Sequence, residues 1–300
     1  LEFRRVLFRS VDKHLSSMND GRNVEIAFFG GSFTGIDIQL QEQYLHSAYT
    51  YIEKGKVSGI RLSTRPDYID EEILCLLKKY GVTAIELGVQ STCNDILRIC
   101  NRGCNNNTIR TASKLIKEHD FSLGLQMMIG LPGDSYSTSQ KTVDDIIAMG
   151  ADNTRIYPTL VVRGTELERM YLRGDYTPLE LDEAVEWAKT FYLQFEKAGV
   201  NVLRVGLHPS PELEQSLCAG PYHRSFKELV MTKIWAGILN SEFFTLCNQR
   251  LSALVHPTQI NYAFGYEGTN RKWWEKKGLD LKIKCDNSLS KYAIEWQILE

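Results

Sequence analysis

The sequence predicts an α/β fold in which parallel strands form a barrel or a sheet covered on both faces. From residue 24 onward, short apolar runs alternate with amphipathic segments, which is the pattern of βα units. The apolar runs are nearly continuous, as in strands buried on both faces. The composition, 43% hydrophobic and 24% charged, is that of an ordinary soluble core and excludes disordered and collagen-like chains.

Six apolar runs are expected to form the strands. They are Val24–Phe29, Gly59–Thr64, Ala84–Val89, Ser122–Ile129, Asn153–Tyr157 and Asn201–Gly206. The segments between them carry apolar residues at helical spacing, and a glycine often follows where the helix would end. Examples of such stripes are Leu45, Ala48, Tyr49 and Ile52, then Ile73, Leu74 and Leu77, then Ile109, Ala112, Leu115 and Ile116, and finally Val143, Ile146 and Ile147.

The pattern changes after about residue 215. A helix comes first, with a stripe at Phe226, Leu229, Val230 and Ile234. Two alternating runs follow, Leu281–Cys285 and Tyr292–Trp296, and alternation of this kind predicts antiparallel hairpin strands. We therefore expect a core over residues 11–214 and a small α+β appendage over residues 215–300.

The charge balance argues against a generally basic or membrane-binding protein. Lys and Arg total 35 and Asp and Glu total 37, so the net charge is −2. The overall charge therefore gives no reason to expect binding to nucleic acid or to an anionic membrane, although a local basic face remains open. No run approaches the roughly 18 apolar residues of a membrane-spanning helix, and the opening does not resemble a secretory signal. A cytoplasmic protein is the expectation.

The seven cysteines are scattered and odd in number, which favours reduced thiols over a disulfide framework. The one local group is Cys93, Cys100 and Cys104. Its spacing is loosely that of a metal site but lacks the paired CxxC of zinc motifs, so ordinary thiols are the favoured interpretation. The residues alone therefore assign no metal ligand.

Candidate binding residues follow the ends of the expected strands, which meet at one rim in a parallel α/β fold. Gly30 and Gly31 come directly after the first strand, where they make either a tight turn or a close approach to a ligand. Arg65 follows the second strand and is placed either to bind an anion or to form a salt bridge with Asp67 or Asp70.

Polar residues also interrupt two of the apolar strands. In the third strand, Glu86, Gly88 and Gln90 share one face by the two-residue period, and a buried Glu86 requires partners. In the fourth, Gln126 is either a satisfied core amide or a group that faces a ligand. With Arg155 at a fifth strand end, these residues predict a site at the rim of a barrel.

Several motifs occur in the order found in radical S-adenosylmethionine (SAM) enzymes. They are Gly30–Phe33, Thr64–Tyr68, Glu86–Ser91, Asn101–Gly103, Met128–Pro132 and Tyr157–Thr165. The set is most similar to the Elongator catalytic-subunit branch, and within it to a bacterial, clostridial-type stand-alone member. The resemblance covers about residues 20–230. It implies a partial (βα)6 TIM-like barrel of radical SAM type.

The resemblance also implies the chemistry and the cofactor site. Enzymes of this family hold a [4Fe-4S] cluster whose unique iron binds S-adenosylmethionine, and its reductive cleavage gives a 5′-deoxyadenosyl radical. By position, the cofactor-binding residues would be Gly30, Gly31, Ser63, Gln90, Arg102 and Gln126. Two positions depart from the family pattern, since Ser63 stands where relatives often carry glutamate and Cys104 where a histidine is common.

The cluster ligands of the family form a CxxxCxxC loop upstream of the glycine motif, and this sequence has no cysteine before Cys75. Thiolates hold such clusters. We therefore expect the sequence as given not to bind the cluster in the usual way and to be inactive. The opening, residues 1–10, does not resemble the family and is interpreted as a non-native or junction segment, with the first βα unit missing.

The resemblance leaves the substrate open. The leading hypothesis is an enzyme that modifies tRNA, and the alternatives are a coproporphyrinogen oxidase-like enzyme acting on a small molecule and a non-catalytic nucleotide-binding barrel. An electron donor such as ferredoxin or flavodoxin is an expected partner, and a membrane is not. No glycine-rich loop indicates an acetyl-CoA domain, so acetyl transfer is not expected of this sequence.

An RNA substrate requires cations that neutralise phosphates and aromatic rings that stack on bases. The candidates in the C-terminal half are Arg163, Arg169, Arg173, Arg204, Arg224, Arg250, Arg271, Lys272, Lys276 and Lys277, interleaved with Tyr222, Trp273 and Trp274. The competing interpretation of residues 271–277 is a solvated helix face whose two tryptophans pack inward.

Overall fold

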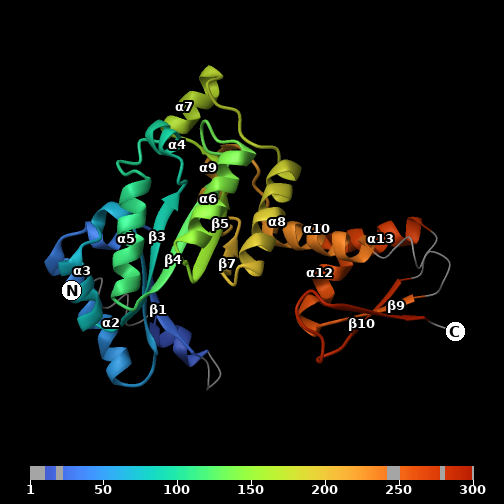
Figure 1. The fold of residues 1–300 in the computed structure, drawn as a ribbon, viewed down its shortest axis with the longest axis horizontal. Coiled ribbons are helices and arrows are strands. Elements are labelled where there is room, and N and C mark those ends of the chain that lie inside the picture. Colours follow the sequence, from blue (N-terminus) through green and yellow to red (C-terminus); the bar gives the residue numbers. More distant parts are fainter. Residues whose placement is uncertain (1–10, 18–22, 242–250, 278–280, 299–300) are drawn as a thin grey trace. The chain divides into compact units, whose positions relative to one another are not determined.

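A six-stranded parallel sheet, curled into a half-barrel, organises the computed structural model, which describes residues 11–17, 23–241, 251–277 and 281–298 (Figure 1). The strand order is β1-β2-β3-β4-β5-β7. The strands are β1 (Glu25–Phe28), β2 (Gly59–Thr64), β3 (Val82–Gln90), β4 (Ser122–Ile129), β5 (Asn153–Pro158) and β7 (Asn201–Val205). The predicted fold class is confirmed, and each predicted apolar run forms a strand within two residues of its expected bounds.

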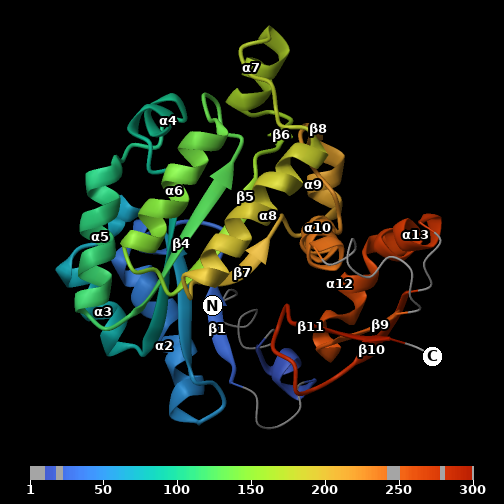
Figure 2. The ribbon, with the colours of Figure 1, turned by 45° about the vertical axis from the view of Figure 1, so that its right-hand side comes forward.

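Helices between successive strands cover one face of this sheet (Figures 1 and 2). They are α2 (Ile38–Glu53), α3 (Glu71–Lys79), α5 (Asn106–Glu118) and α6 (Tyr136–Ala148), with a short α4 (Asn94–Ile99) at the end of β3. Their starts are defined by side chains that accept a hydrogen bond from the first helical turn, namely Asp37, Asp70, Asn105 and Ser135. The apolar stripes face the sheet, so Leu45, Leu74, Ile109 and Val143 are fully buried.

The other elements in the described part of the chain include four short 3-10 helices, six helices and two small sheets. Three-residue 3-10 helices lie after β1 (Phe33–Gly35), after β2 (Pro66–Tyr68), and at Pro257–Gln259 and Tyr266–Gly268. The helices are α7 (Glu166–Arg173), α8 (Leu181–Lys197), α9 (Pro211–Ser216), α10 (Phe226–Ser241), α12 (Ile260–Phe264) and α13 (Thr269–Lys276). Two small sheets contain β6 (Val161–Val162) with β8 (Leu217–Ala219), and β9 (Leu251–Val255) with β10 (Leu281–Cys285) and β11 (Ile294–Ile298).

The C-terminal hairpin prediction is wrong in its pairing. Both predicted strands exist as β10 and β11, but each pairs with β9, which lies between them. β10 runs parallel to β9 and β11 runs antiparallel to it. The physical reason is burial: Ser252, Ala253 and Val255 of β9 are fully buried, so β9 takes the central position that needs partners on both edges.

Contacts divide the chain into two compact units. One contains residues 1–157 and 194–203, and the other contains residues 158–193 and 204–300. This division differs from a boundary at residue 214, which stays a prediction. The expected junction segment, residues 1–10, lies outside the described residues. Among the helices of the described residues, none has the length and apolar character needed to cross a membrane.

Candidate functional site

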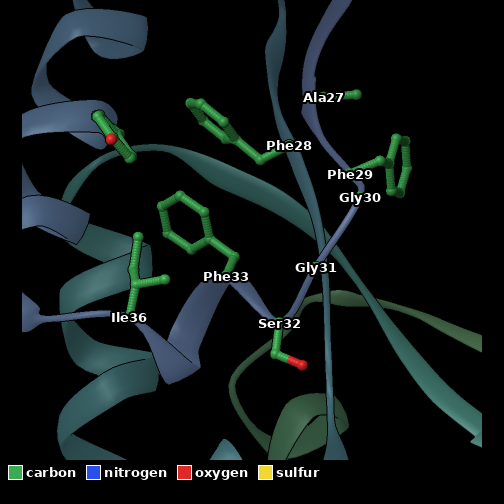
Figure 3. A pocket seen from close by; sticks show the side chains of 9 residues that line it. Ala27, Phe28, Phe29, Gly30, Gly31, Ser32, Phe33 and Ile36 are labelled. Carbon is green, nitrogen blue, oxygen red and sulfur yellow. The ribbon is translucent and has the colours of Figure 1, made fainter. Parts of the chain in front are cut away.

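The loop after β1 lines a cavity of about 390 Å³ together with Ala27 and Phe28 of β1 and Tyr44 of α2 (Figure 3). Gly30 has φ +102°, a conformation that side-chain-bearing residues rarely adopt, and a Cβ placed on either Gly30 or Gly31 would meet no atom within 4 Å. The glycines therefore leave space above the backbone. Phe28 and Phe33 pack together on one side of this chain segment, with ring centroids 4.9 Å apart, and Phe29 lies on the other.

Buried hydrogen bonds hold this loop against the end of β2. The hydroxyls of Thr34 and Thr64 lie 2.6 Å apart, and both side chains are buried. The Gln41 side chain, from α2, donates to the backbone carbonyls of Thr34 and Ile36. Ser63 Oγ lies 3.4 Å from the carbonyl oxygen of Gly31, to which it donates. The glycine loop is thus fixed to the sheet from two sides.

Glu86 is the centre of a buried ionic cluster at the middle of the sheet. It is 1% exposed. Arg155 Nε donates to Glu86 Oε2 at 2.6 Å and Arg155 Nη2 donates to Oε1 at 3.0 Å, which is a two-pronged pair. Arg61 Nη1 donates to Oε1 at 3.0 Å and Gln126 Nε2 donates to Oε2 at 2.9 Å. Arg61 also pairs with Glu25 at 3.0 Å, so two carboxylates balance two guanidinium groups.

Burial alone would raise the pKa of Glu86, but hydrogen bonds from Arg155, Gln126 and Arg61 together hold that pKa below its usual range. Glu86 is therefore ionised and its charge is matched. The Arg155 guanidinium also lies 4.8 Å from the ring centroid of Phe29, the residue that precedes the glycine pair. The Glu86 cluster thereby holds Phe29 in place next to the glycine pair.

The end of β3 is irregular, and its irregularity places Gln90. Gly88 pairs with Gln126 of β4 while Gln90 pairs with Met127, so Val89 is an extra residue in the ladder. Gln90 has φ +66°, which costs a non-glycine residue about 1–3 kcal/mol. Its Oε1 is buried and has no hydrogen-bond partner. Strain together with an unsatisfied buried acceptor is typical of a functional site.

Arg102 reaches the same point from the loop between α4 and α5. Its Nη2 donates to the carbonyl of Gly88 at 2.7 Å, whereas its Nε is buried and lacks a partner. Its own carbonyl accepts from Arg65 at 2.8 Å, and Arg65 is paired with Asp67 at 2.7 Å. Arg65 therefore forms the salt bridge with Asp67, one of the two roles open to it, and it ties two rim loops together.

Nearby thiols stay neutral. Burial raises the pKa of Cys100 and of Cys104, and the Arg102 guanidinium only partly opposes this. Within the described part of the chain, no group of three or more His, Cys, Asp or Glu side chains is arranged to hold a metal ion. The cysteines there are unpaired thiols, at Cys75, Cys93, Cys100, Cys104, Cys218 and Cys285.

Of the six candidate cofactor-binding residues, Gly30 and Gly31 line the cavity after β1 and the other four do not. Ser63, Gln90 and Gln126 lie on β2, β3 and β4, and Arg102 lies in the loop between α4 and α5. Ser63 contacts Gly31 and stands beside Glu86 in the ladder. Gln126 donates to Glu86, and a Cβ at Gly88 would lie 3.3 Å from Gln90 Nε2 and 3.5 Å from Arg102 Nη2. Their role in binding stays a prediction. The glycine pair and Gln90 lie at the carboxyl ends of their strands, as the parallel topology requires of a rim site, whereas Gln126 lies three residues before the end of β4.

The sequence reasoning missed Arg61 and did not connect Arg155 with Glu86. Arg61 is a lone charge within an apolar strand, which is the same signal that marked Glu86. Glu86 is 25 residues from Arg61 and 69 from Arg155, so no local spacing predicts their contact. The aromatic wall of Phe28 and Phe33 was likewise not predicted.

The residues expected to face RNA are scattered. Arg169, Arg173, Arg224 and Arg271 form exposed ion pairs with Glu166, Asp175, Glu214 and Glu275, respectively. Arg250 lies outside the described residues. In α13, Trp274 is buried at 1% exposure, but Trp273 is 37% exposed. The interpretation with two inward tryptophans is therefore wrong for Trp273.

Two family profiles match most of the chain. The profile of the radical SAM superfamily matches residues 3–146, and the profile of the radical SAM C-terminal domain matches residues 151–236. The first match begins inside the opening segment, so the junction interpretation of residues 1–10 stays a prediction.

Characterised proteins with similar sequences include the tRNA uridine(34) acetyltransferase of Methanocaldococcus infernus, 30% identical over 183 residues, or 54% of this chain and 34% of that protein. Elongator complex protein 3 of Mus musculus is 30% identical over 214 residues, or 62% of this chain and 36% of that protein. The chain thus spans about a third of the length of these relatives. Among solved structures, archaeal Elp3 of M. infernus with an N-terminal deletion superposes with a TM-score of 0.68 at 26% identity, covering 77% of this chain and 57% of that one.

Proposed function

The chain belongs to the radical SAM superfamily, and on this premise we propose that its strand-end rim binds S-adenosylmethionine for radical chemistry on tRNA. The main support for this proposal is that two buried polar atoms at the rim have no hydrogen-bond partner. Gln90 Oε1 and Arg102 Nε are buried and lack partners, and separately a Cβ at either Gly30 or Gly31 would meet no atom within 4 Å. A polar ligand bound there would supply the missing hydrogen bonds.

The residues present fit the cofactor in chemical type. Glycine backbone at positions 30 and 31 allows a close approach, and Ser63, Gln90, Arg102 and Gln126 offer hydroxyl, amide and guanidinium groups to its polar parts. The aromatic wall of Phe28 and Phe33 is suited to an apolar or planar portion. When bound, S-adenosylmethionine supplies one-electron cleavage to a 5′-deoxyadenosyl radical.

The protein residues contribute binding and order rather than redox chemistry. Glu86 holds Gln126 by a direct hydrogen bond, and Arg155, which is paired with Glu86, contacts the ring of Phe29. Arg65 holds Arg102 by donating to its backbone carbonyl. The described residues do not fit an iron–sulfur cluster, because no group of three potential ligands exists among them. These residues are therefore given no role in holding the iron–sulfur cluster. The expected inactivity of the sequence as given stays a prediction.

The substrate class rests on the relatives. Proteins similar to this chain are named as acting on uridine 34 of tRNA, which supports tRNA over a small molecule such as a porphyrinogen. Acetyl transfer is not part of the proposal. Ferredoxin or flavodoxin would be the electron donor, and the cytoplasm would be the compartment, since tRNA is present there.

Isothermal titration calorimetry of the purified chain with S-adenosylmethionine tests the site. Gly31→Val should weaken binding at least about tenfold, because its side chain enters the open space that the ligand needs. Gln90→Met should also weaken binding, because it removes the unsatisfied acceptor. Neither should lower the melting temperature, since no atom obstructs the first and no hydrogen bond of Gln90 Oε1 is lost in the second.

Gly237→Val provides a matched control, because Gly237 also has open space for a Cβ and lies in α10, which contributes none of the candidate binding residues. It should leave binding of S-adenosylmethionine unchanged. Absence of binding by the parent protein would refute the proposed function. Equal binding by the parent and both rim variants would refute this location of the site.

A further inference from the structure

A second cavity, of about 420 Å³, is lined by residues of α8, α10 and α13. Its lining is mostly apolar, and this volume is within the range of about 300–1,000 Å³ that small-molecule sites occupy. All of its lining residues belong to the same compact unit. Neither the rim site nor the radical chemistry uses it.

Trp273 forms an aromatic side of this second cavity and packs against Trp274. Trp274 is 1% exposed and packs on Trp296 with ring centroids 5.7 Å apart, so it is anchored in the core of the appendage. Trp273 meets Trp274 edge to face at 6.0 Å and is 37% exposed. A rigid, partly open indole of this kind provides a stacking surface at little cost in conformational entropy.

The cavity also contains an unsatisfied acceptor. Asn240 Oδ1 is buried and has no hydrogen-bond partner. Asn270 is 7% exposed, and its amide nitrogen is already used, donating to the carbonyls of Thr232 and Ala263. Asn240 Oδ1 is therefore a buried acceptor in the lining of this cavity that an N–H or O–H group could satisfy.

Positive charge surrounds Trp273 although the whole chain is slightly negative. Within seven residues, α13 and its end carry Arg271, Lys272, Lys276 and Lys277 against the single acid Glu275. The Lys277 ammonium lies 5.5 Å from the ring centroid of Trp273. At the cavity, Lys233 pairs with Glu186 at 3.3 Å. Asp182 also lines the cavity, so the excess of positive charge is confined to α13 and its end, where it is complementary to a ligand that carries phosphates.

We propose that this cavity, lined by Trp273 and Asn240, receives one unstacked base of a single-stranded RNA segment while the cations of α13 contact its phosphates. Stacking on an aromatic ring plus an amide that reads a base edge is how proteins hold single-stranded bases. The assignment of RNA rests on the proposed function. The cavity and the orphaned acceptor are independent of it.

Binding of a fluorescently labelled single-stranded RNA dodecamer to the full chain, measured by anisotropy at low salt, tests this. Trp273→Ala should weaken binding by about five- to a hundredfold, the range expected for one base stacked on an aromatic ring. Trp273→Phe should restore most of the affinity. Asn240→Leu should weaken binding without lowering the melting temperature, because the acceptor that it removes is unsatisfied in the free protein.

Two controls separate stacking from charge. Tyr171→Ala removes an aromatic side chain that is also 37% exposed but lies in α7, and it should leave binding unchanged. An otherwise identical dodecamer with abasic positions should bind weakly and be indifferent to Trp273→Ala. Sensitivity of the abasic dodecamer to this substitution would overturn the stacking role.

Three further results would overturn the proposal. They are no binding of the dodecamer by the parent chain, equal binding by the parent and Trp273→Ala, and equal affinity for the dodecamer and a free nucleoside. The last would assign the cavity to a small nucleoside instead. Because this assay contains no S-adenosylmethionine, its failure leaves the rim site to be judged by the calorimetric titration alone.

Discussion

At the scale of single residues, Glu86 shows how one buried charge orders several strands. Its carboxylate accepts from Arg155, Arg61 and Gln126, which come from three different strands, β5, β2 and β4. Such a cluster contributes little net stability compared with an apolar core of similar volume, but removal of one member leaves buried charges without a partner. The Glu86 cluster instead fixes the positions of the polar side chains of Arg155, Arg61 and Gln126 inside the sheet.

Glu86→Gln should therefore reduce the free energy of unfolding by about 3–5 kcal/mol, measured by urea denaturation, because both guanidinium groups lose their common counter-charge. Glu118→Gln is the control. Glu118 is 55% exposed in a surface pair with Lys114, and its replacement should change the free energy by less than about 0.5 kcal/mol. Similar effects of the two substitutions would contradict the central role of Glu86.

The Glu86 cluster also makes the free energy of unfolding depend on pH. The direction of this dependence follows from the lowered pKa of Glu86. The stabilisation is fully present above the ordinary glutamate pKa of about 4.3 and is lost as the pH falls through the lower folded-state value. Comparing urea midpoints of the parent and Glu86→Gln should therefore show their difference shrinking below about pH 4.

At the scale of elements, β4 carries a glycine whose small size is required by its neighbour. A Cβ at Gly124 would lie 2.6 Å from Glu86 Cγ and 3.2 Å from Glu86 Cβ. Gly124 and Glu86 are also paired in the ladder. β4 therefore leaves the room that the carboxylate needs in order to reach Arg155, and the composition of one strand depends on the charge in the next.

Gly124→Ala should destabilise the protein by about 1–3 kcal/mol, because the buried Glu86 side chain is pushed out of its hydrogen-bonding position. Gly237→Ala is a matched control within a helix, where no atom obstructs the new Cβ, and it should stabilise the protein by up to about 1 kcal/mol. Thermal unfolding of both variants measures the difference. An unchanged melting temperature for Gly124→Ala would show that Glu86 relaxes freely.

The predictable part of the molecule is the part with local patterns. β2 and β4 were predicted with their observed ends, because each is an apolar run bounded by turn residues. β9 was missed, because a five-residue run with Ser252 at its second position has no distinctive periodicity, and its central place depends on tertiary burial. The rim residues were found from strand ends, whereas the cavity at Trp273 depends on helices brought together by packing.

At the scale of the whole molecule, the charge is nearly balanced, with a net value of −2. Any attraction for RNA must therefore be local, and the chain as a whole provides no long-range steering toward a polyanion. The Arg271–Lys277 segment is where positive charge is locally concentrated next to an exposed aromatic ring. Binding that depends on so few cations should respond moderately to salt.

Replacing Arg271 and Lys272 together by alanine should lower the slope of log affinity against log salt concentration by about 1.4, since each phosphate contact to single-stranded nucleic acid contributes about 0.7. Arg98→Ala with Lys114→Ala serves as the control, because these exposed cations lie on α4 and α5. They should leave the slope unaltered. An identical slope for the parent and the Arg271 and Lys272 variant would argue against phosphate contacts by α13.

The extra residue at the end of β3 limits how this strand can change in length. Deleting Val89 would restore regular pairing with β4 and relieve the left-handed backbone at Gln90. Gln90 would keep Met127 as its partner but would follow Gly88 directly, and so would present the opposite face of the sheet. A shortened β3 would thus pair more regularly with β4, but it would lose the fully buried Val89 side chain and the orientation of Gln90 on which the proposed binding site depends.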